Sequence, residues 1–138
     1  MVHAKRCLII ITEDNAELRE LLAKYLGERY HCLTAATAED AVKLLVSSPF
    51  NFILTDILLP GASGLELCKI VRATHPETSV ILMSASPDLR FEVEAARLRA
   101  FDYLRKPFSL SQLDNTLEHS LRHQALYSEL RSITSSAG

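Results

Sequence analysis

The chain has 138 residues, 48% of them apolar and 23% charged, and a formal net charge of −2. These values are typical of one globular domain with a full hydrophobic core. The small net charge gives no electrostatic reason to expect nucleic acid or an anionic membrane as a partner. The apolar run at residues 7–11 is too short to span a bilayer and has no small-residue cleavage site, so we expect neither an anchor nor a signal peptide.

The three cysteines, Cys7, Cys32 and Cys68, are scattered along apolar stretches and form no CxxC pair. An odd and dispersed set of this kind is typical of buried, reduced thiols. We therefore expect a cytoplasmic protein.

The first half of the chain alternates short apolar runs with segments of helical period. Residues 7–12 (CLIIIT) form a continuous β-branched run, which is typical of a strand buried on both faces. Residues 15–28 repeat apolar side chains three and four positions apart, as an amphipathic helix does. A weaker strand at 31–35 precedes a helix that Thr37 opens with a capping-box-like TAED sequence. A third buried strand at residues 50–55 ends at Asp56.

The second half repeats the same alternation. Pro60, Gly61 and Gly64 mark a loop before a helix at residues 65–74. This helix is expected to end there because His75 precedes a proline. A strand at 80–83, a helix at 87–98 and a strand at 101–104 follow. Five strand-then-helix units with short connections predict an α/β fold. Its sheet is parallel with helices on both faces, because parallel strands need crossover connections.

The last helix, which Ser109 is expected to cap, is longer than one domain requires. Leu110, Leu113, Leu117 and Leu121 are expected to pack, and the helical pattern continues to Ser132, a length of about 36 Å at 1.5 Å per residue. The apolar stripe changes phase near His123. We therefore separate residues 1–123, as the main domain, from 124–138, as a helical extension with a flexible end. This extension is either a frayed end or a linker or dimerisation helix.

Acidic residues follow two of the predicted strands. Glu13 and Asp14 come after the first strand and Asp56 after the third. In an open parallel sheet, functional groups gather at the carboxyl ends of the strands, and strands one and three are neighbours in the order 2-1-3-4-5. Carboxylates about 4 Å apart repel by about 4 kcal/mol at an effective dielectric of 20, so the cluster needs a cation, a bound proton or a lysine. Hard oxygen ligands open to water suit Mg²⁺.

Two further strand ends add polar groups. Lys106 follows the fifth strand and precedes Pro107, so its backbone is extended, and its ammonium can bridge carboxylate or phosphate oxygens. Ser84 ends the fourth strand and brings a hydroxyl. Each residue has a simpler interpretation by itself: Asp14 as a helix cap, Glu13 as a surface charge and Ser84 as a strand-end cap. Together they predict a site.

These residues resemble the receiver domains of two-component response regulators. The resemblance rests on Glu13 and Asp14, on Asp56 with the LLPGASG segment after it, on Ser84-Ala85, and on the YLRKPF segment at residues 103–108. It covers residues 7–121 in order. It implies the flavodoxin-like (βα)₅ fold with strand order 2-1-3-4-5 and an extended C-terminal helix.

The resemblance also implies roles. Asp56 would be the phosphorylated residue, and the catalytic set would be Asp56, Lys106 and Ser84. Asp14, Asp56 and the Leu58 carbonyl would hold Mg²⁺, and Glu13 would act through a coordinated water. Ser84 and Tyr103 would form the switch pair, with Tyr103 turning from exposed to buried after phosphorylation; the simpler interpretation of Tyr103 is a half-buried core aromatic.

The implied partners are a sensor histidine kinase and a downstream output domain or target protein. The implied signalling surface is the helix at residues 87–98, the strand at 101–104 and the last helix, through which a homodimer could form. No direct nucleic-acid or membrane binding is expected. The domain would promote its own phosphorylation and dephosphorylation without being a multiple-turnover enzyme, and it could be the front piece of a longer regulator.

Three positions depart from the family pattern. Leu58 stands where methionine or another bulky residue is common, Ser84 replaces a threonine that is also common, and Arg99-Ala100 stands where Gly-Ala often ends the helix. Arg99 adopts a left-handed cap less cheaply than glycine. Two other functions stay open. One is a pseudo-receiver that only binds protein; the other is an aspartyl-phosphate hydrolase, although its usual second acid is absent at Leu58.

Overall fold

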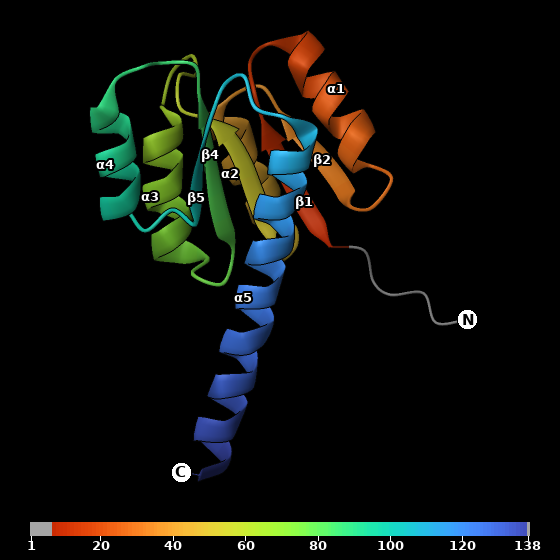
Figure 1. The fold of residues 1–138 in the computed structure, drawn as a ribbon, viewed down its shortest axis with the longest axis vertical. Coiled ribbons are helices and arrows are strands. Elements are labelled where there is room, and N and C mark those ends of the chain that lie inside the picture. The colour runs from red at the N-terminus through yellow and green to blue at the C-terminus, as the bar shows by residue number, and fades with distance from the viewer. Residues whose placement is uncertain (1–6, 138) are drawn as a thin grey trace. The chain divides into compact units, whose positions relative to one another are not determined.

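Five parallel strands form one sheet in the computed structural model, which describes residues 7–137. The strand order is β2-β1-β3-β4-β5, as predicted, and every neighbouring pair is parallel (Figure 1). The strands are β1 (Leu8–Thr12), β2 (His31–Ala35), β3 (Phe52–Asp56), β4 (Ser79–Ser84) and β5 (Asp102–Arg105).

The three central strands have almost no exposed residues. Every residue of β3 is buried, and so is every residue of β1 and β4 except the first. Continuous apolar runs such as LIII and FIL can be buried on both faces only where helices cover both sides of a sheet. The central strands therefore hold the site residues at their ends on a rigid base.

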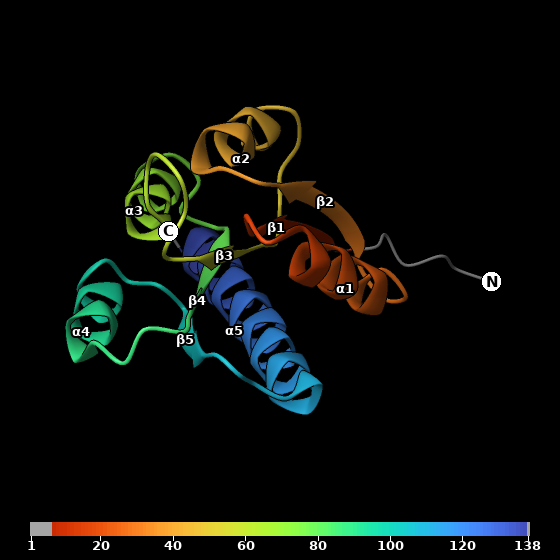
Figure 2. The same cartoon turned by 90° about the horizontal axis from the view of Figure 1, so that it is seen from above.

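Four helices and the sheet belong to one compact unit, and this unit ends at Lys106. α1 contacts β1 and β2 from one face, whereas α2 and α3 lie on the opposite face and contact each other (Figure 2). α4 contacts β5. Their bounds are α1 (Ala16–Leu26), α2 (Ala38–Leu45), α3 (Gly64–Thr74) and α4 (Leu89–Arg97).

Each of these four helices begins with a capping side chain, and the cap of α2 differs from the prediction. Thr37 accepts a hydrogen bond from the Asp40 backbone N–H at 3.1 Å, but the Asp40 carboxylate lies near Lys43 instead of completing a capping box. The reciprocal box forms at α3, where the Ser63 and Glu66 side chains each accept from the other's backbone N–H. The TAED pattern thus predicted the start of α2 correctly, but its prediction of a capping box there was wrong.

α4 ends in a left-handed residue that is not glycine. Arg99 has a φ of 62°. Its N–H donates to Ala96 O at 3.1 Å, and the Ala100 N–H donates to Ala95 O at 3.0 Å. These two bonds form a Schellman motif, in which the left-handed position is usually glycine. α4 therefore ends in this motif with an arginine, and not a glycine, in the left-handed position.

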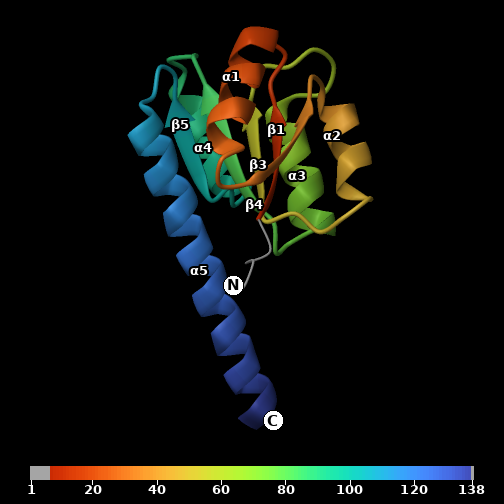
Figure 3. The same ribbon diagram turned by 90° about the vertical axis from the view of Figure 1, so that its right-hand side faces the viewer.

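α5 (Leu110–Ala137) belongs to a second compact unit that begins at Pro107. Ser109 caps it as predicted, accepting from the Gln112 N–H at 3.0 Å. The helix has 28 residues, or about 42 Å, and continues past the predicted end at Ser132 (Figure 3). Leu113 and Leu117 are buried, but Leu110 is 38% exposed, so its predicted packing is wrong.

The distal part of α5 carries exposed apolar side chains, namely Leu126, Tyr127, Leu130 and Ile133. None of the helices in the described part of the chain has the length and apolarity that a membrane crossing requires. None of the three cysteines, all of which lie in the described part of the chain, forms a disulfide; Cys68 is buried, whereas Cys7 and Cys32 are only partly buried. The predicted burial of the thiols therefore holds for Cys68 alone.

Candidate functional site

The predicted site residues lie at one edge of the sheet. Asp56 is the last residue of β3, Ser84 is the last residue of β4, and Glu13 follows β1 directly. Lys106 follows β5, and its N–H donates to Ser84 O at 2.8 Å, which extends the pairing of β4 with β5 by one residue. Because all five strands are parallel, their carboxyl ends share this edge.

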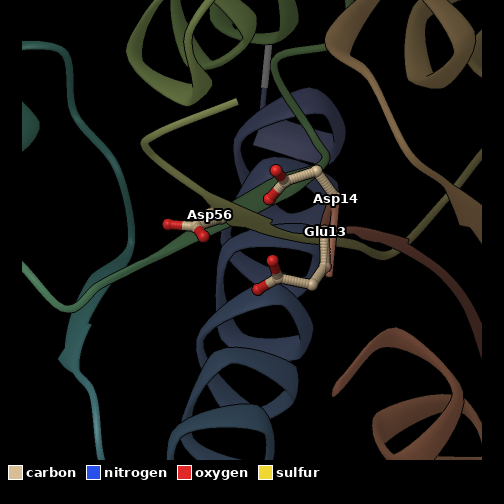
Figure 4. Close-up of side chains that lie close together, drawn as sticks. All are labelled: Glu13, Asp14 and Asp56. Atoms are coloured by element: carbon tan, nitrogen blue, oxygen red, sulfur yellow. The ribbon is translucent and has the colours of Figure 1, made fainter. Parts of the chain in front are cut away.

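Three carboxylates gather there (Figure 4). One oxygen each from Glu13, Asp14 and Asp56 lies within 4.8 Å of the others. Glu13 is 1% exposed and Asp56 is 8% exposed, whereas Asp14 is exposed to solvent. The sequence prediction that these acids converge is confirmed, and their mutual repulsion makes a positive charge at this place favourable.

Lys106 provides part of that positive charge. Its Nζ donates to Glu13 Oε1 at 2.6 Å and to Asp56 Oδ2 at 2.9 Å. Burial by itself lowers the pKa of Lys106, but the hydrogen bonds to Glu13 and Asp56 and their negative charges outweigh it and raise that pKa. The ammonium is therefore charged at neutral pH and bridges two of the three acids.

Hydrogen bonds fix both the backbone and the side chain of Glu13. Its N–H donates to Ala35 O at 3.0 Å, and its two carboxylate oxygens accept from Lys106 and from the Asn15 N–H. Burial raises the pKa of Glu13, and the nearby charge of Asp56 raises it further, against the lowering effect of the Lys106 and Asn15 hydrogen bonds. Glu13 is thus part of the site and not the surface charge of the simpler interpretation.

Asp14 is not a helix cap. The α1 cap is Asn15, whose side chain accepts from the Leu18 N–H at 3.0 Å. The Asp14 carboxylate has no hydrogen-bond partner among residues 7–137. It is therefore exposed and available beside two partly neutralised acids.

The loop after Asp56 depends on a close backbone approach. The Gly64 N–H donates to Ile57 O at 2.8 Å, and a Cβ at Gly64 would lie 2.1 Å from Asp56 O. Leu58 donates its N–H to Asp56 Oδ1 at 3.4 Å, and its side chain is 57% exposed. The loop therefore turns closely against the end of β3, and the Leu58 side chain points to solvent beside a mostly buried Asp56.

The two predicted switch residues are not bonded to the acids. The Ser84 hydroxyl is buried and accepts from the Ser86 N–H at 3.0 Å, as a strand-end cap does. Tyr103 is half-buried and packs against the core, and its hydroxyl is buried without a hydrogen-bond partner among the described residues. The expected exposed starting position of Tyr103 is therefore not the one found; the ring already points inward.

Two contributors were missed by the sequence interpretation. Asn15 both caps α1 and binds Glu13, and an asparagine at a helix start was a signal that could have been read. Arg19 Nη1 donates to Glu13 O at 2.7 Å, a contact across the first turn of α1 that no periodicity indicates.

Comparison with known proteins agrees with this arrangement. Residues 9–118 match the family model of the response regulator receiver domain. The chain is 35% identical over 114 residues to the response regulator protein PilR of Pseudomonas aeruginosa, and 32% identical over 120 residues to the DNA-binding transcriptional regulator NtrC of Escherichia coli. These matches cover 82% and 86% of this chain but only 26% of each relative, so the chain spans about a quarter of their length.

A solved structure has the same fold. The response regulator protein TrrA of Thermotoga maritima, solved in complex with Mg²⁺-BeF, matches 83% of this chain and 98% of its own at 29% identity, with a TM-score of 0.75. The sheet order, the acids at the strand ends and the family match over most of the chain lead to one conclusion: the chain belongs to the response regulator receiver domain family.

Proposed function

We propose that this chain is a phosphorylation switch in which Asp56 accepts a phosphoryl group from the phosphohistidine of a partner histidine kinase. The observation that carries the proposal is the position of Lys106. Its ammonium bridges Asp56 and Glu13, while the Asp14 carboxylate beside them has no partner among residues 7–137. A nucleophilic carboxylate, a cation and further acids within reach are what an aspartyl-phosphate site needs.

The chemistry requires one bond to form and one to break. A carboxylate oxygen of Asp56 bonds to phosphorus as the nitrogen–phosphorus bond of phosphohistidine breaks, and the electron pair of that bond stays on the imidazole nitrogen. Lys106, 2.9 Å from Asp56 Oδ2, stabilises the charge on the oxygens of the transferred group. The product is a mixed anhydride on Asp56.

The acid cluster fits Mg²⁺. Its three carboxylates offer hard oxygen ligands within 4.8 Å of one another, and Asp14 is open to solvent. Asp14, Asp56 and the Leu58 carbonyl would hold the ion, and Glu13, whose two oxygens accept from the Asn15 N–H and from Lys106, would act mainly through a coordinated water. The bound ion would supply the second positive charge that the phosphoryl group requires.

The response to phosphorylation would begin at Ser84. Its hydroxyl now accepts from the Ser86 N–H, and it would turn to donate to a phosphoryl oxygen. That movement would bias Tyr103, α4 and β5, where Arg105 of β5 forms an ion pair with Glu92 of α4. A shift from 1:99 to 99:1 needs about 5.5 kcal/mol, which a few charge-assisted hydrogen bonds can supply.

We further propose that the domain acts in the cytoplasm as a switch and not as a multiple-turnover enzyme, and that its signal passes to an output domain or target protein. The relatives PilR and NtrC, which are about four times as long as the matched segment, support an output domain in the same polypeptide.

The proposal is tested by incubating the protein with acetyl phosphate and Mg²⁺ and measuring the intact mass. We expect the addition of one phosphoryl group, no addition when EDTA is present, and no addition to Asp56→Asn. Asp88→Asn is the matched control, because Asp88 caps α4, its carboxylate pairs with Arg90, and it is not one of the three carboxylates of the cluster. An unchanged mass of the wild-type protein, or a labelled Asp56→Asn variant, would contradict the proposal.

A further inference from the structure

A single guanidinium holds the backbone from which two of the three acids project. Arg19 lies in the second turn of α1 and is half-buried. Its Nη1 donates to Glu13 O at 2.7 Å, and the same nitrogen lies 3.5 Å from Asp14 O. The side chain therefore reaches back over the start of the helix to two consecutive peptide groups.

The base of this contact is itself fixed. The Arg19 N–H donates to Asn15 O at 2.9 Å, and Asn15 caps the helix through the Leu18 N–H. Arg19 is thus attached to the first turn of α1, and α1 contacts β1 and β2. Because α1 is packed against the sheet, the Arg19 guanidinium fixes the position of the Glu13–Asp14 turn, which belongs neither to β1 nor to α1.

The two acids depend on this contact to different degrees. Glu13 has three further hydrogen bonds, one through its N–H and two through its carboxylate. Asp14 is exposed and its carboxylate has no partner among residues 7–137, so the direction of its side chain follows its backbone. Loss of the Arg19 contact should therefore disturb Asp14 more than Glu13.

The chemistry of the contact also matters. Arg19 donates to carbonyl oxygens and not to the carboxylates, so it fixes the turn without occupying the oxygens that a cation would use. Both contacts come from one guanidinium nitrogen, so a lysine ammonium could replace part of the contact, without the fixed planar geometry of arginine. Outer contacts of this kind orient metal ligands, and their removal typically weakens metal binding about 10-fold to 100-fold.

We propose that Arg19 is a positioning residue for cation binding: it orients the Glu13–Asp14 turn so that Asp14 faces Asp56 before the ion arrives. This inference rests on the proposed function, because it concerns the same acid cluster. It assigns to Arg19 an effect on Mg²⁺ affinity, separate from the rate of phosphoryl transfer once the ion is bound.

The test is a Mg²⁺ titration of the ¹⁵N-labelled protein without any phosphodonor, followed by amide chemical shifts. We expect Arg19→Met to weaken Mg²⁺ binding about 10-fold and Arg19→Lys to recover part of the loss. In acetyl phosphate labelling, the Mg²⁺ concentration for half-maximal rate should rise by the same factor. The rate at saturating Mg²⁺ should stay within about twofold of wild type.

Arg72→Met is the matched control. Arg72 Nη1 donates to a backbone carbonyl at the same distance, 2.7 Å to Pro76 O, but in the turn after α3. This variant should keep wild-type Mg²⁺ affinity. An Arg19→Met protein that binds Mg²⁺ like wild type would overturn the inference, and so would equal losses in the Arg19 and Arg72 variants. If Arg19→Met does not fold, Arg19→Lys with wild-type affinity would overturn it.

The two proposals fail in different ways. A wild-type protein that neither binds Mg²⁺ nor accepts a phosphoryl group contradicts the proposed function, whatever Arg19 does. A wild-type protein that does both, together with an Arg19→Met variant of unchanged affinity, contradicts only the role of Arg19.

Discussion

Gly64 lies so close to the end of β3 that a Cβ on it would be 2.1 Å from the backbone carbonyl oxygen of Asp56. The same side chain would be 2.9 Å from the Ile57 Cα, and both of these atoms belong to the backbone. Neither can move away as the end of a flexible side chain could. The first turn of α3 can therefore pack against the end of β3 only while residue 64 has no side chain.

Gly64→Ala should destabilise the protein by about 1–3 kcal/mol, the usual cost of forcing an extra carbon into a packed site. Urea unfolding measures the change in the free energy of unfolding. Lys69→Ala, at an exposed position of the same helix, should change it by less than about 0.5 kcal/mol. A Gly64→Ala protein as stable as wild type would show that the two backbone segments can separate at no cost.

Arg99→Gly should stabilise the protein by about 0.5–1 kcal/mol. Arg99 has a φ of 62°, a conformation that costs a side-chain-bearing residue roughly 1–2 kcal/mol, and glycine's larger unfolded-state entropy offsets part of that gain. The comparison is with Arg97→Gly in the last turn of α4, which should lose about 1 kcal/mol because the helix there is right-handed. Equal losses in both variants would contradict the left-handed cap.

Tyr103→Phe should leave the free energy of unfolding unchanged or raise it by about 1 kcal/mol. The Tyr103 hydroxyl is buried without a partner among the described residues, and such a group pays its desolvation cost without a compensating hydrogen bond. Tyr127→Phe, at a residue that is 59% exposed, should have an effect within a few tenths of a kcal/mol. A loss above about 1 kcal/mol for Tyr103→Phe would mean that the hydroxyl is bonded in solution.

Stability should fall between pH 9 and pH 11 because of Cys68. Burial raises the pKa of the Cys68 thiol from 9.0 to about 11. A raised pKa means that the folded state holds the proton longer than the unfolded state, so this contribution is complete below pH 9 and is lost as the pH rises through 11. The loss is about 2–3 kcal/mol at full deprotonation.

Urea unfolding of Cys68→Ala across this range measures that contribution, because the variant should lose stability less steeply than wild type. Val71→Ala removes another buried side chain of α3 without removing a titrating group, so it should keep the wild-type slope. Identical slopes for wild type and Cys68→Ala would show that the thiol is not desolvated in the folded protein.

The sequence alone was sufficient for the fold and for most of the site. Runs such as CLIII and FIL mark strands buried on both faces, and the alternation with helical periods implies a parallel sheet with strand ends on one edge. Once that edge was predicted, the acids at Glu13, Asp14 and Asp56 and the lysine at Lys106 were expected to meet, and they do. The pattern of apolar residues is a local property of the chain, and it indicates which face of each element is buried.

Only the tertiary structure decided which atoms bond. Lys106 reaches Glu13 and Asp56 from 93 and 50 positions away, and Arg19, not a strand-end residue, holds the turn of the acids. The structure was also needed to show that the Tyr103 hydroxyl is buried and that Arg99 has a left-handed backbone. The physical reason is that a rotamer or a strained dihedral is selected by partners distant in sequence, whereas a pattern of apolar residues reports only which face of an element is covered.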